Sequence, residues 1–115
     1  MAIPSGSGTE VLKRAYKTAN SDNWETMITG VANHIYTILS VSFADQNDTV
    51  HDCRIKIDIS GGGTDIYLLS FQTLPVKGVF TWNDKFVITG TDQLKCYNSA
   101  GNVDIYVSYI DQDWT

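Results

Sequence analysis

The chain has few of the residues on which metal sites, disulfide frameworks and redox centres depend. Its 115 residues include only two cysteines, two histidines and two prolines. Cys53 and Cys96 do not form a CxxC pair, and His34 and His51 lie too far apart in sequence to complete a zinc motif with them. Without an export signal, a native disulfide is not expected either. The sequence therefore predicts a protein without a metal or a cofactor.

Long hydrophobic runs are also absent. No stretch of about 18 apolar residues occurs, so the sequence predicts no membrane-spanning segment. Residues 1–8 lack the basic and apolar regions of a signal peptide, which predicts synthesis in a cytoplasm. Gly6 and Gly8 loosen this segment and Pro4 opposes a helix, so we expect residues 1–8 to be a flexible N-terminal arm.

Positive charge is scarce outside the N-terminal segment. The formal net charge is −5. In residues 1–20 three cations against one acid give +2, and in the remainder five cations against twelve acids give −7. An acidic body argues against nucleic-acid binding, because phosphate contacts need a basic face. The basic segment, with Lys13, Arg14 and Lys17, suits an acidic protein surface, although a solvated strand with scattered lysines has the same composition.

Short alternating runs dominate the rest of the chain. The clearest is residues 51–60, in which Cys53, Ile55 and Ile57 alternate with Arg54 and Lys56. Only a β-strand places alternate residues on opposite faces, so this run has one buried and one solvated face. Similar runs recur at short intervals, which indicates an all-β, antiparallel β-sandwich of about eight strands. A jelly roll is one arrangement of eight strands. We expect one such domain over residues 9–115.

Four local expectations can be tested directly. Thr9–Thr18 is read as a strand, although Leu12 and Tyr16 also have helical spacing. Asn83-Asp84-Lys85 is predicted to be a hairpin turn between the strands 79–82 and 86–89. The run 66–71 is apolar on both parities, which suggests a central strand or one covered by a partner. The last strand is expected over 103–110, with Val103, Ile105, Val107 and Tyr109 facing the core.

No catalytic motif stands out, and we predict that the protein is not an enzyme. His51 and Cys53 share a strand face, but no nucleophile elbow accompanies them. Residues 61–63 are three glycines without the Lys-Ser/Thr of a phosphate loop, which indicates a turn. The acids of the 45–48 loop lack the pattern of an EF-hand, and a sugar platform would need aromatic residues such as Trp24, Trp82 and Trp114.

Four segments carry a family resemblance. They are Ile3-Pro4-Ser5-Gly6-Ser7-Gly8-Thr9-Glu10-Val11-Leu12-Lys13-Arg14, Asn33-His34-Ile35-Tyr36-Thr37-Ile38-Leu39-Ser40, Asp84-Lys85-Phe86-Val87-Ile88 and Tyr109-Ile110-Asp111-Gln112-Asp113-Trp114. Together they contain 31 of the 115 residues, and they resemble small virion proteins of tailed bacteriophages. Within that group the head decoration, or cement, proteins look nearest. Tail, neck and baseplate accessory proteins and a carbohydrate-binding host-recognition module are alternatives.

The resemblance implies a role in the virion rather than in catalysis. The expected partners are the major capsid protein or other virion proteins, together with further copies of the chain, for which a trimer is the expected closed state. Neither nucleic acid nor a membrane is expected as a partner. The predicted interface consists of Ile3, Pro4, Lys13, Arg14, Lys17 and Trp114. Trp114 lies beyond the last predicted strand, where it either folds back or anchors on another subunit.

Overall fold

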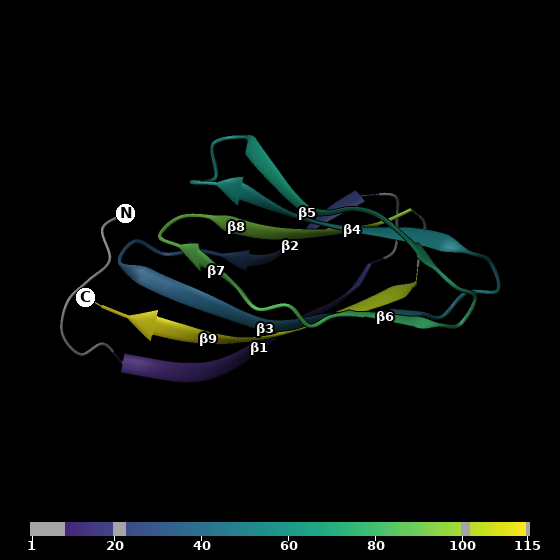
Figure 1. Ribbon diagram of the computed structural model, residues 1–115, viewed down its shortest axis with the longest axis horizontal. Coiled ribbons are helices and arrows are strands. Elements are labelled where there is room, and N and C mark those ends of the chain that lie inside the picture. Colours follow the sequence, from purple (N-terminus) through teal and green to yellow (C-terminus); the bar gives the residue numbers. More distant parts are fainter. Residues whose placement is uncertain (1–8, 20–22, 100–101, 115) are drawn as a thin grey trace.

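The computed structural model describes residues 9–19, 23–99 and 102–114. Figure 1 shows two layers of strands that pack face to face, and no helix occurs in these ranges. The nine strands are β1 (Thr9–Ala19), β2 (Asn23–Thr29), β3 (His34–Asp45), β4 (His51–Ile59), β5 (Thr64–Leu74), β6 (Val79–Trp82), β7 (Phe86–Thr89), β8 (Gln93–Asn98) and β9 (Val103–Asp113). The predicted all-β antiparallel sandwich is therefore confirmed.

The strands pair antiparallel in a nested order, so that each pair encloses the next one in the sequence. β4 pairs with β5, β3 with both β6 and β7, β2 with β8, and β1 with β9. Pairing of β9 with β3, and of β8 with β4, joins these pairs into two sheets. Sheet A has the order β1-β9-β3, with β6 and β7 along the far side of β3, and sheet B has the order β2-β8-β4-β5.

The inward-facing side chains form one hydrophobic core between the sheets. Cys53 and Ile55 of β4 and Ile105 and Val107 of β9 are at most 1% exposed, as their sequence parity predicted. The other fully buried apolar side chains are Ala19, Ile38, Val41, Phe43, Leu74, Ile88, Leu94, Cys96 and Val103. Each buried aliphatic or aromatic side chain contributes roughly 1.5–3 kcal/mol, so this core is what holds the two layers together.

The predicted hairpin at residues 83–85 is wrong. β6 pairs with Val41–Ala44 and β7 with Ile35–Ile38, so both strands run antiparallel to β3 as successive pieces of one sheet edge. None of the residues 83–85 has the positive φ that a two-residue hairpin turn requires, and the chain does not reverse there. The irregular segment lies opposite the register shift between Ile38 and Ser40, and the Trp82 indole N–H donates to the carbonyl of Asp84 at 2.9 Å.

The run 66–71 lies in β5, which is the edge strand of sheet B and not a central one. Its apolar residues on both parities therefore reach solvent, with Ile66 50%, Tyr67 48% and Phe71 59% exposed. Only Leu68, Leu69 and Leu74 of this strand pack into the core or against it. The central-strand alternative is wrong because an apolar run does not reveal whether a neighbouring strand pairs beyond it. Coverage of β5 by a partner stays a prediction.

The two ends of the described chain meet in one sheet. β1 is a strand, as preferred over the helical alternative, and it pairs with β9 over its whole length, from Thr9 opposite Asp113 to Ala19 opposite Val103. β9 continues to Asp113, three residues beyond the predicted end. The predicted arm, residues 1–8, lies outside the described residues. The glycine turn is confirmed, since Gly61 and Gly63 have φ values of 64° and 89°.

Candidate interaction surface

β1 is the edge strand of sheet A, and almost all of it is exposed on both faces. Because strand residues alternate, its cations divide between the two faces. Lys13 and Lys17 share the inner parity with Ala15, which packs against the core. Arg14 shares the outer parity with Leu12 and Tyr16. The structure therefore does not bring the three predicted interface cations together.

The two lysines of β1 are engaged in ion pairs within the chain. Lys13 Nζ lies 2.8 Å from an Asp111 carboxylate oxygen, and Lys17 Nζ lies 3.7 Å from a Glu25 oxygen on β2. The hydrogen bond to Asp111 raises the pKa of Lys13 above its usual value, against the opposing effect of desolvation. Both lysines thus help to tie the edge strand to the rest of the sandwich.

Asp111 also joins β3 to this cluster. His34 Nδ1 lies 2.7 Å from the second Asp111 oxygen, and His34 Nε2 lies 3.5 Å from Asp113. The His34 ring stacks on Tyr36 with a centroid distance of 5.8 Å. Burial of Asp111 favours its neutral form, but the hydrogen bonds from Lys13 and His34 outweigh burial and lower the pKa of this carboxyl. The cluster holds an acid and a base, but no serine or cysteine of the described residues makes a hydrogen bond to either of them.

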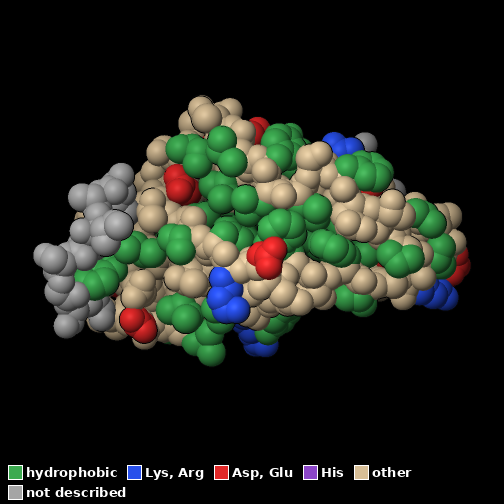
Figure 2. Space-filling model, in the orientation of Figure 1, with side chains coloured by type: hydrophobic (Ala, Val, Ile, Leu, Met, Phe, Trp, Pro, Cys, Tyr) green, Lys and Arg blue, Asp and Glu red, His purple; other side chains and the backbone are tan. Residues whose placement is uncertain are grey.

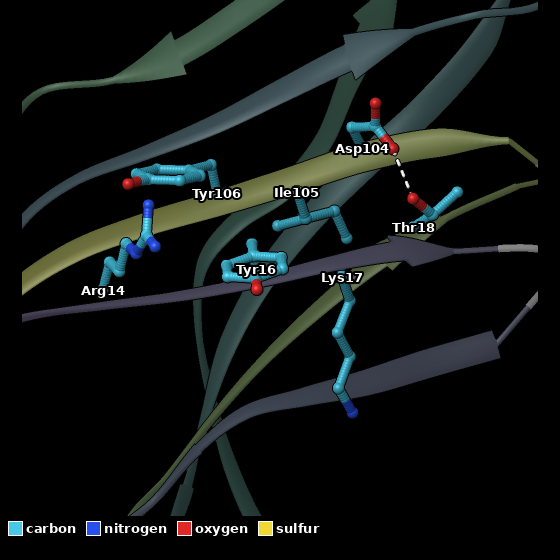
Figure 3. Close-up of a pocket in the computed structure, with 7 residues that line it drawn as sticks. All are labelled: Arg14, Tyr16, Lys17, Thr18, Asp104, Ile105 and Tyr106. Atoms are coloured by element: carbon cyan, nitrogen blue, oxygen red, sulfur yellow. Dashed lines mark hydrogen bonds between the residues drawn. The ribbon is translucent and has the colours of Figure 1, made fainter.

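The outer face of β1 and β9 carries a contrasting group of residues, shown in Figure 3. Tyr16 and Tyr106 face each other across the two strands and stack, with centroids 6.3 Å apart and an interplanar angle of 13°. The Arg14 guanidinium lies 5.5 Å from the Tyr16 ring centroid, and hydrogen bonding with the Tyr106 hydroxyl raises the pKa of Arg14. Lys17 points away from this group, and Thr18 donates to Asp104 at its other end.

Two open hollows flank these side chains. The first has a volume of about 380 Å³ and is lined by Arg14, Tyr16, Thr18, Asp104 and Tyr106, among others. The second, about 550 Å³, lies on the other side of Arg14 and is bordered by Leu12, Leu39 and Ser108. Neither is enclosed, and neither holds a converging set of acids and bases. Shallow, mostly apolar hollows of this kind are better suited to contact with another protein than to binding of a small substrate.

Trp114 folds back onto its own chain. Its backbone N–H donates to the carbonyl of Asn33 at 3.0 Å, and its ring is half-buried. The indole N–H is shielded from solvent and has no acceptor among the described residues. Of the two expectations for this residue, the structure supports folding back. The predicted interface residues Ile3 and Pro4 lie outside the described part of the chain.

Sheet B carries a group of aromatic and cationic side chains that sequence reasoning did not assemble. Lys56 Nζ lies 4.1 Å from the Trp24 ring centroid, and the Arg54 guanidinium lies 4.7 Å from that of Tyr97. Trp24 and Tyr97 themselves lie 5.2 Å apart. Lys56 is further paired with Asp65 at 3.0 Å, and Arg54 with Asp52 at 2.9 Å. The alternation in β4 placed these cations outward, but it could not show which aromatic residues lie beside them.

The predicted absence of catalytic and metal-binding motifs can be compared with the described residues only. Within them, no three His, Cys, Asp or Glu side chains are grouped so as to hold a metal ion. Burial raises the pKa of Cys53 to about 12, so the thiolate needed for nucleophilic chemistry does not form near neutral pH. His51 Nε2 lies 3.2 Å from the Thr49 hydroxyl. The described chain also contains no helix long and apolar enough to span a membrane.

Comparison with known proteins gives a fold and no family. No family model matches the chain, and no curated protein matches it. A protein of the Bacillus endospore appendages, described as disulfide-linked pili, superposes with a TM-score of 0.57 and 13% identity, over 100% of this chain and 97% of the other. A protein of the acid-stable capsid of Helicobacter pylori bacteriophage KHP30 gives 0.52 and 12%, over 93% and 90%.

A third match comes from the T13 particle of the virus IBDV. Its TM-score is 0.59 at 10% identity, over 97% of this chain but only 33% of that chain. At such identities the three structures show a shared fold and nothing more about activity or partners.

Proposed function

We propose that the chain is a structural protein of a bacteriophage particle, and specifically a head decoration (cement) protein that binds and stabilises the capsid shell by protein–protein contacts. One observation carries the proposal. The edge strand β1 presents large apolar and aromatic side chains to solvent, with Leu12 72% and Tyr16 65% exposed, on a rigid sandwich. Exposed groups of this kind mark association surfaces. The shared fold with a phage capsid protein over 93% of the chain is consistent with this role.

We further infer a jelly-roll topology and a homo-oligomeric state, for which a trimer is the expected closed form. The nested pairing of β4 with β5, β3 with β6 and β7, β2 with β8, and β1 with β9 supports the topology, if β6 and β7 count as one interrupted strand. The partners are the major capsid protein or other virion proteins, and the location is the virion. The acidic body, with −5 overall, makes nucleic acid an unsuitable partner. In the face shown in Figure 2 the charged side chains are scattered singly.

The contact with the shell is assigned to the arm, residues 1–8 with Ile3 and Pro4, and Arg14 on β1 is assigned to the contact with a further copy of the chain. Lys13 and Lys17 serve less well as contact residues, because each already pairs with a carboxylate of its own chain. Trp114 is half-buried against its own chain, so it supports the contact by shaping the end of sheet A.

Deleting residues 1–8 tests this assignment. We expect the truncated chain to lose co-sedimentation with capsid shells of the virus that encodes it, while its melting temperature stays within about 2 °C of the full chain, since the described hydrophobic core is built from side chains between Ala19 and Val107. The matched control is Lys85→Ala, an exposed cation in the segment between β6 and β7. Shell binding that survives the deletion unchanged contradicts the proposed arm contact.

A subunit of an extracellular appendage is the second candidate. It is favoured by the match to the Bacillus appendage protein, which extends over 97% of that chain. Both cysteines of the present chain are free and buried, so a disulfide-linked assembly does not carry over to it. Incubation of the purified chain alone distinguishes this candidate, because a filament subunit forms filaments visible by negative-stain microscopy and a decoration protein does not.

The remaining alternatives are a tail, neck or baseplate accessory protein and a carbohydrate-binding host-recognition module. The first is distinguished by whether the chain binds purified tails or heads. For the second, a glycan array on the isolated chain is the test. The Trp24 ring already faces Lys56 Nζ at 4.1 Å, which leaves it less available for stacking on a sugar.

A further inference from the structure

The outer face of β1 and β9 has the composition of an interface centre. Leu12, Tyr16 and Tyr106 are 72%, 65% and 41% exposed, so three large side chains of this face reach solvent. Tyr and Arg are the residues most enriched among those that dominate protein–protein binding energy. The Tyr16–Tyr106 stack, with Arg14 beside it, therefore forms a rigid and amphipathic centre.

Arg14 lacks the counter-ion that the other two cations of β1 possess. Lys13 and Lys17 each lie within 4 Å of a carboxylate, and among the described residues no carboxylate comes that close to the Arg14 guanidinium. It lies 5.5 Å from the Tyr16 ring centroid and beside Tyr106, as Figure 3 shows. A guanidinium held in this way presents its remaining donors outward, in the fork geometry that matches a carboxylate.

Asp104 is the corresponding acid on the same face. It is exposed and accepts hydrogen bonds from the Thr18 hydroxyl and the Gln46 amide, and no cation lies within ion-pair distance of it in the described ranges. An ionised carboxylate has about four acceptor positions, so two hydrogen bonds leave it able to receive a guanidinium. Arg14 and Asp104 thus lie on the same face with opposite charges, and neither has a charged partner among the described residues.

The register of β1 and β9 places these two charges symmetrically about the tyrosine pair. Tyr16 lies opposite Tyr106, Arg14 opposite Ser108, and Thr18 opposite Asp104. Arg14 is therefore two residues from the tyrosine pair in one direction and Asp104 two residues in the other, or roughly 7 Å along the strands each way. Consider a two-fold axis that lies between the two copies, parallel to this face, and runs across the strands at the tyrosine pair. It brings Arg14 of each copy over Asp104 of the other.

We propose that this face is a two-fold contact between two copies of the chain, centred on Tyr16 and Tyr106 and closed by two reciprocal Arg14–Asp104 ion pairs. Such an isologous contact uses the same patch on both copies. The open hollow of about 380 Å³ between Arg14 and Asp104 gives the side chains of the second copy room to enter. The inference deepens the homo-oligomeric part of the proposed function and rests on it, and it leaves other surfaces free for a three-fold contact.

Charge exchange tests the geometry directly. Arg14→Asp and Asp104→Arg, each alone, place like charges opposite each other in both pairs, so each variant should dimerise at least 10-fold more weakly than the wild type in sedimentation equilibrium. An equimolar mixture of the two variants should regain dimers, because in the mixed pair both contacts again join opposite charges. This rescue occurs only if residue 14 of one copy meets residue 104 of the other.

Controls separate folding, assembly and shell binding. Lys85→Asp makes the same charge change at an exposed site away from the patch and should leave dimerisation unchanged. Tyr16→Ala removes an exposed ring on which Arg14 packs, changes no charge and should also weaken dimers, so the proposal stays testable if Asp104→Arg fails to fold. A wild-type chain that stays monomeric at high concentration, or two folded variants that do not rescue each other, overturns the two-fold contact. Shell binding, measured separately with the chain that lacks residues 1–8, decides the proposed function independently.

Discussion

Replacing Asp111 by Asn should destabilise the fold by more than any single surface substitution. The Asp111 carboxylate is 8% exposed and accepts hydrogen bonds from two residues on neighbouring strands, Lys13 of β1 and His34 of β3, at 2.8 and 2.7 Å. It therefore links three strands of sheet A at the end where the chain enters and leaves the sandwich. An asparagine keeps the shape, removes the charge and replaces one acceptor oxygen by an NH2 donor, so the change in stability reports on the loss of these charged hydrogen bonds.

The magnitude follows from the different exposures of the two donors. The Lys13 side chain is 46% exposed and can return to water, so loss of its ion pair costs little. The His34 side chain is only 16% exposed, so water does not replace the hydrogen bond that it loses. A hydrogen bond to a charged group contributes about 1.5–3 kcal/mol. We expect a loss of about 2 kcal/mol, or about 8 °C in melting temperature for a domain of this size. The assay is thermal unfolding by circular dichroism, with the exposed Asp84→Asn as control.

The pH dependence supplies the refuting result. Because the pKa of Asp111 in the folded chain lies below its ordinary value of 3.8, its contribution is present above that value and disappears as the pH falls through the lower, folded value. The difference in stability between the wild type and Asp111→Asn should therefore be full at pH 6 and shrink in strong acid. A difference below about 0.5 kcal/mol at pH 6, or one that grows on acidification, refutes the electrostatic link.

Two further predictions concern the backbone and the buried thiols. Gly30→Ala should cost about 3 kcal/mol in urea unfolding, because a Cβ there would lie 2.0 Å from the carbonyl oxygen of Gly90, whereas Gly62→Ala, with its nearest atom at 3.7 Å, should cost less than 1. Equal effects of the two substitutions would contradict this. Cys53 and Cys96 should resist a thiol reagent in the native chain and react in denaturant, since both are 0% exposed and burial raises the pKa of each. Labelling of native protein within minutes at pH 7 would show that the core opens readily.

The strands themselves could be predicted because alternation is a local property. The parity of β4 and β9 identified the buried faces correctly, since one covered face imposes the same period whatever the neighbouring strand is. The hairpin at 83–85 was wrong because polar turn residues also occur where one strand is interrupted. The sequence of β5 did not distinguish an edge strand from a central one, because that depends on whether another strand pairs beyond it.

The candidate surface could not be predicted, because it depends on which strands are neighbours. Arg14 was identified from composition as an interface residue, together with Lys13 and Lys17. Its separation from the lysines follows from parity, but its contact with Tyr106 requires β1 to pair with β9, about 90 residues further along the chain. The Asp111 cluster has the same origin, since His34 and Asp111 are 77 residues apart. Both groups of contacts become apparent only once the pairing register of the strands is known.

The charges of β1 also explain why association should use the face of this strand and not its edge. An exposed edge strand offers unpaired backbone groups to any other strand, and lysines or inward-pointing charges are the usual protection against such pairing. Lys13 and Lys17 occupy the inner parity of β1 and are anchored there by Asp111 and Glu25. A strand added beside β1 would have to place its own inner-face residues against these ion pairs. The outer face carries no such obstacle, so contact through Arg14 and the two tyrosines leaves the protected edge undisturbed.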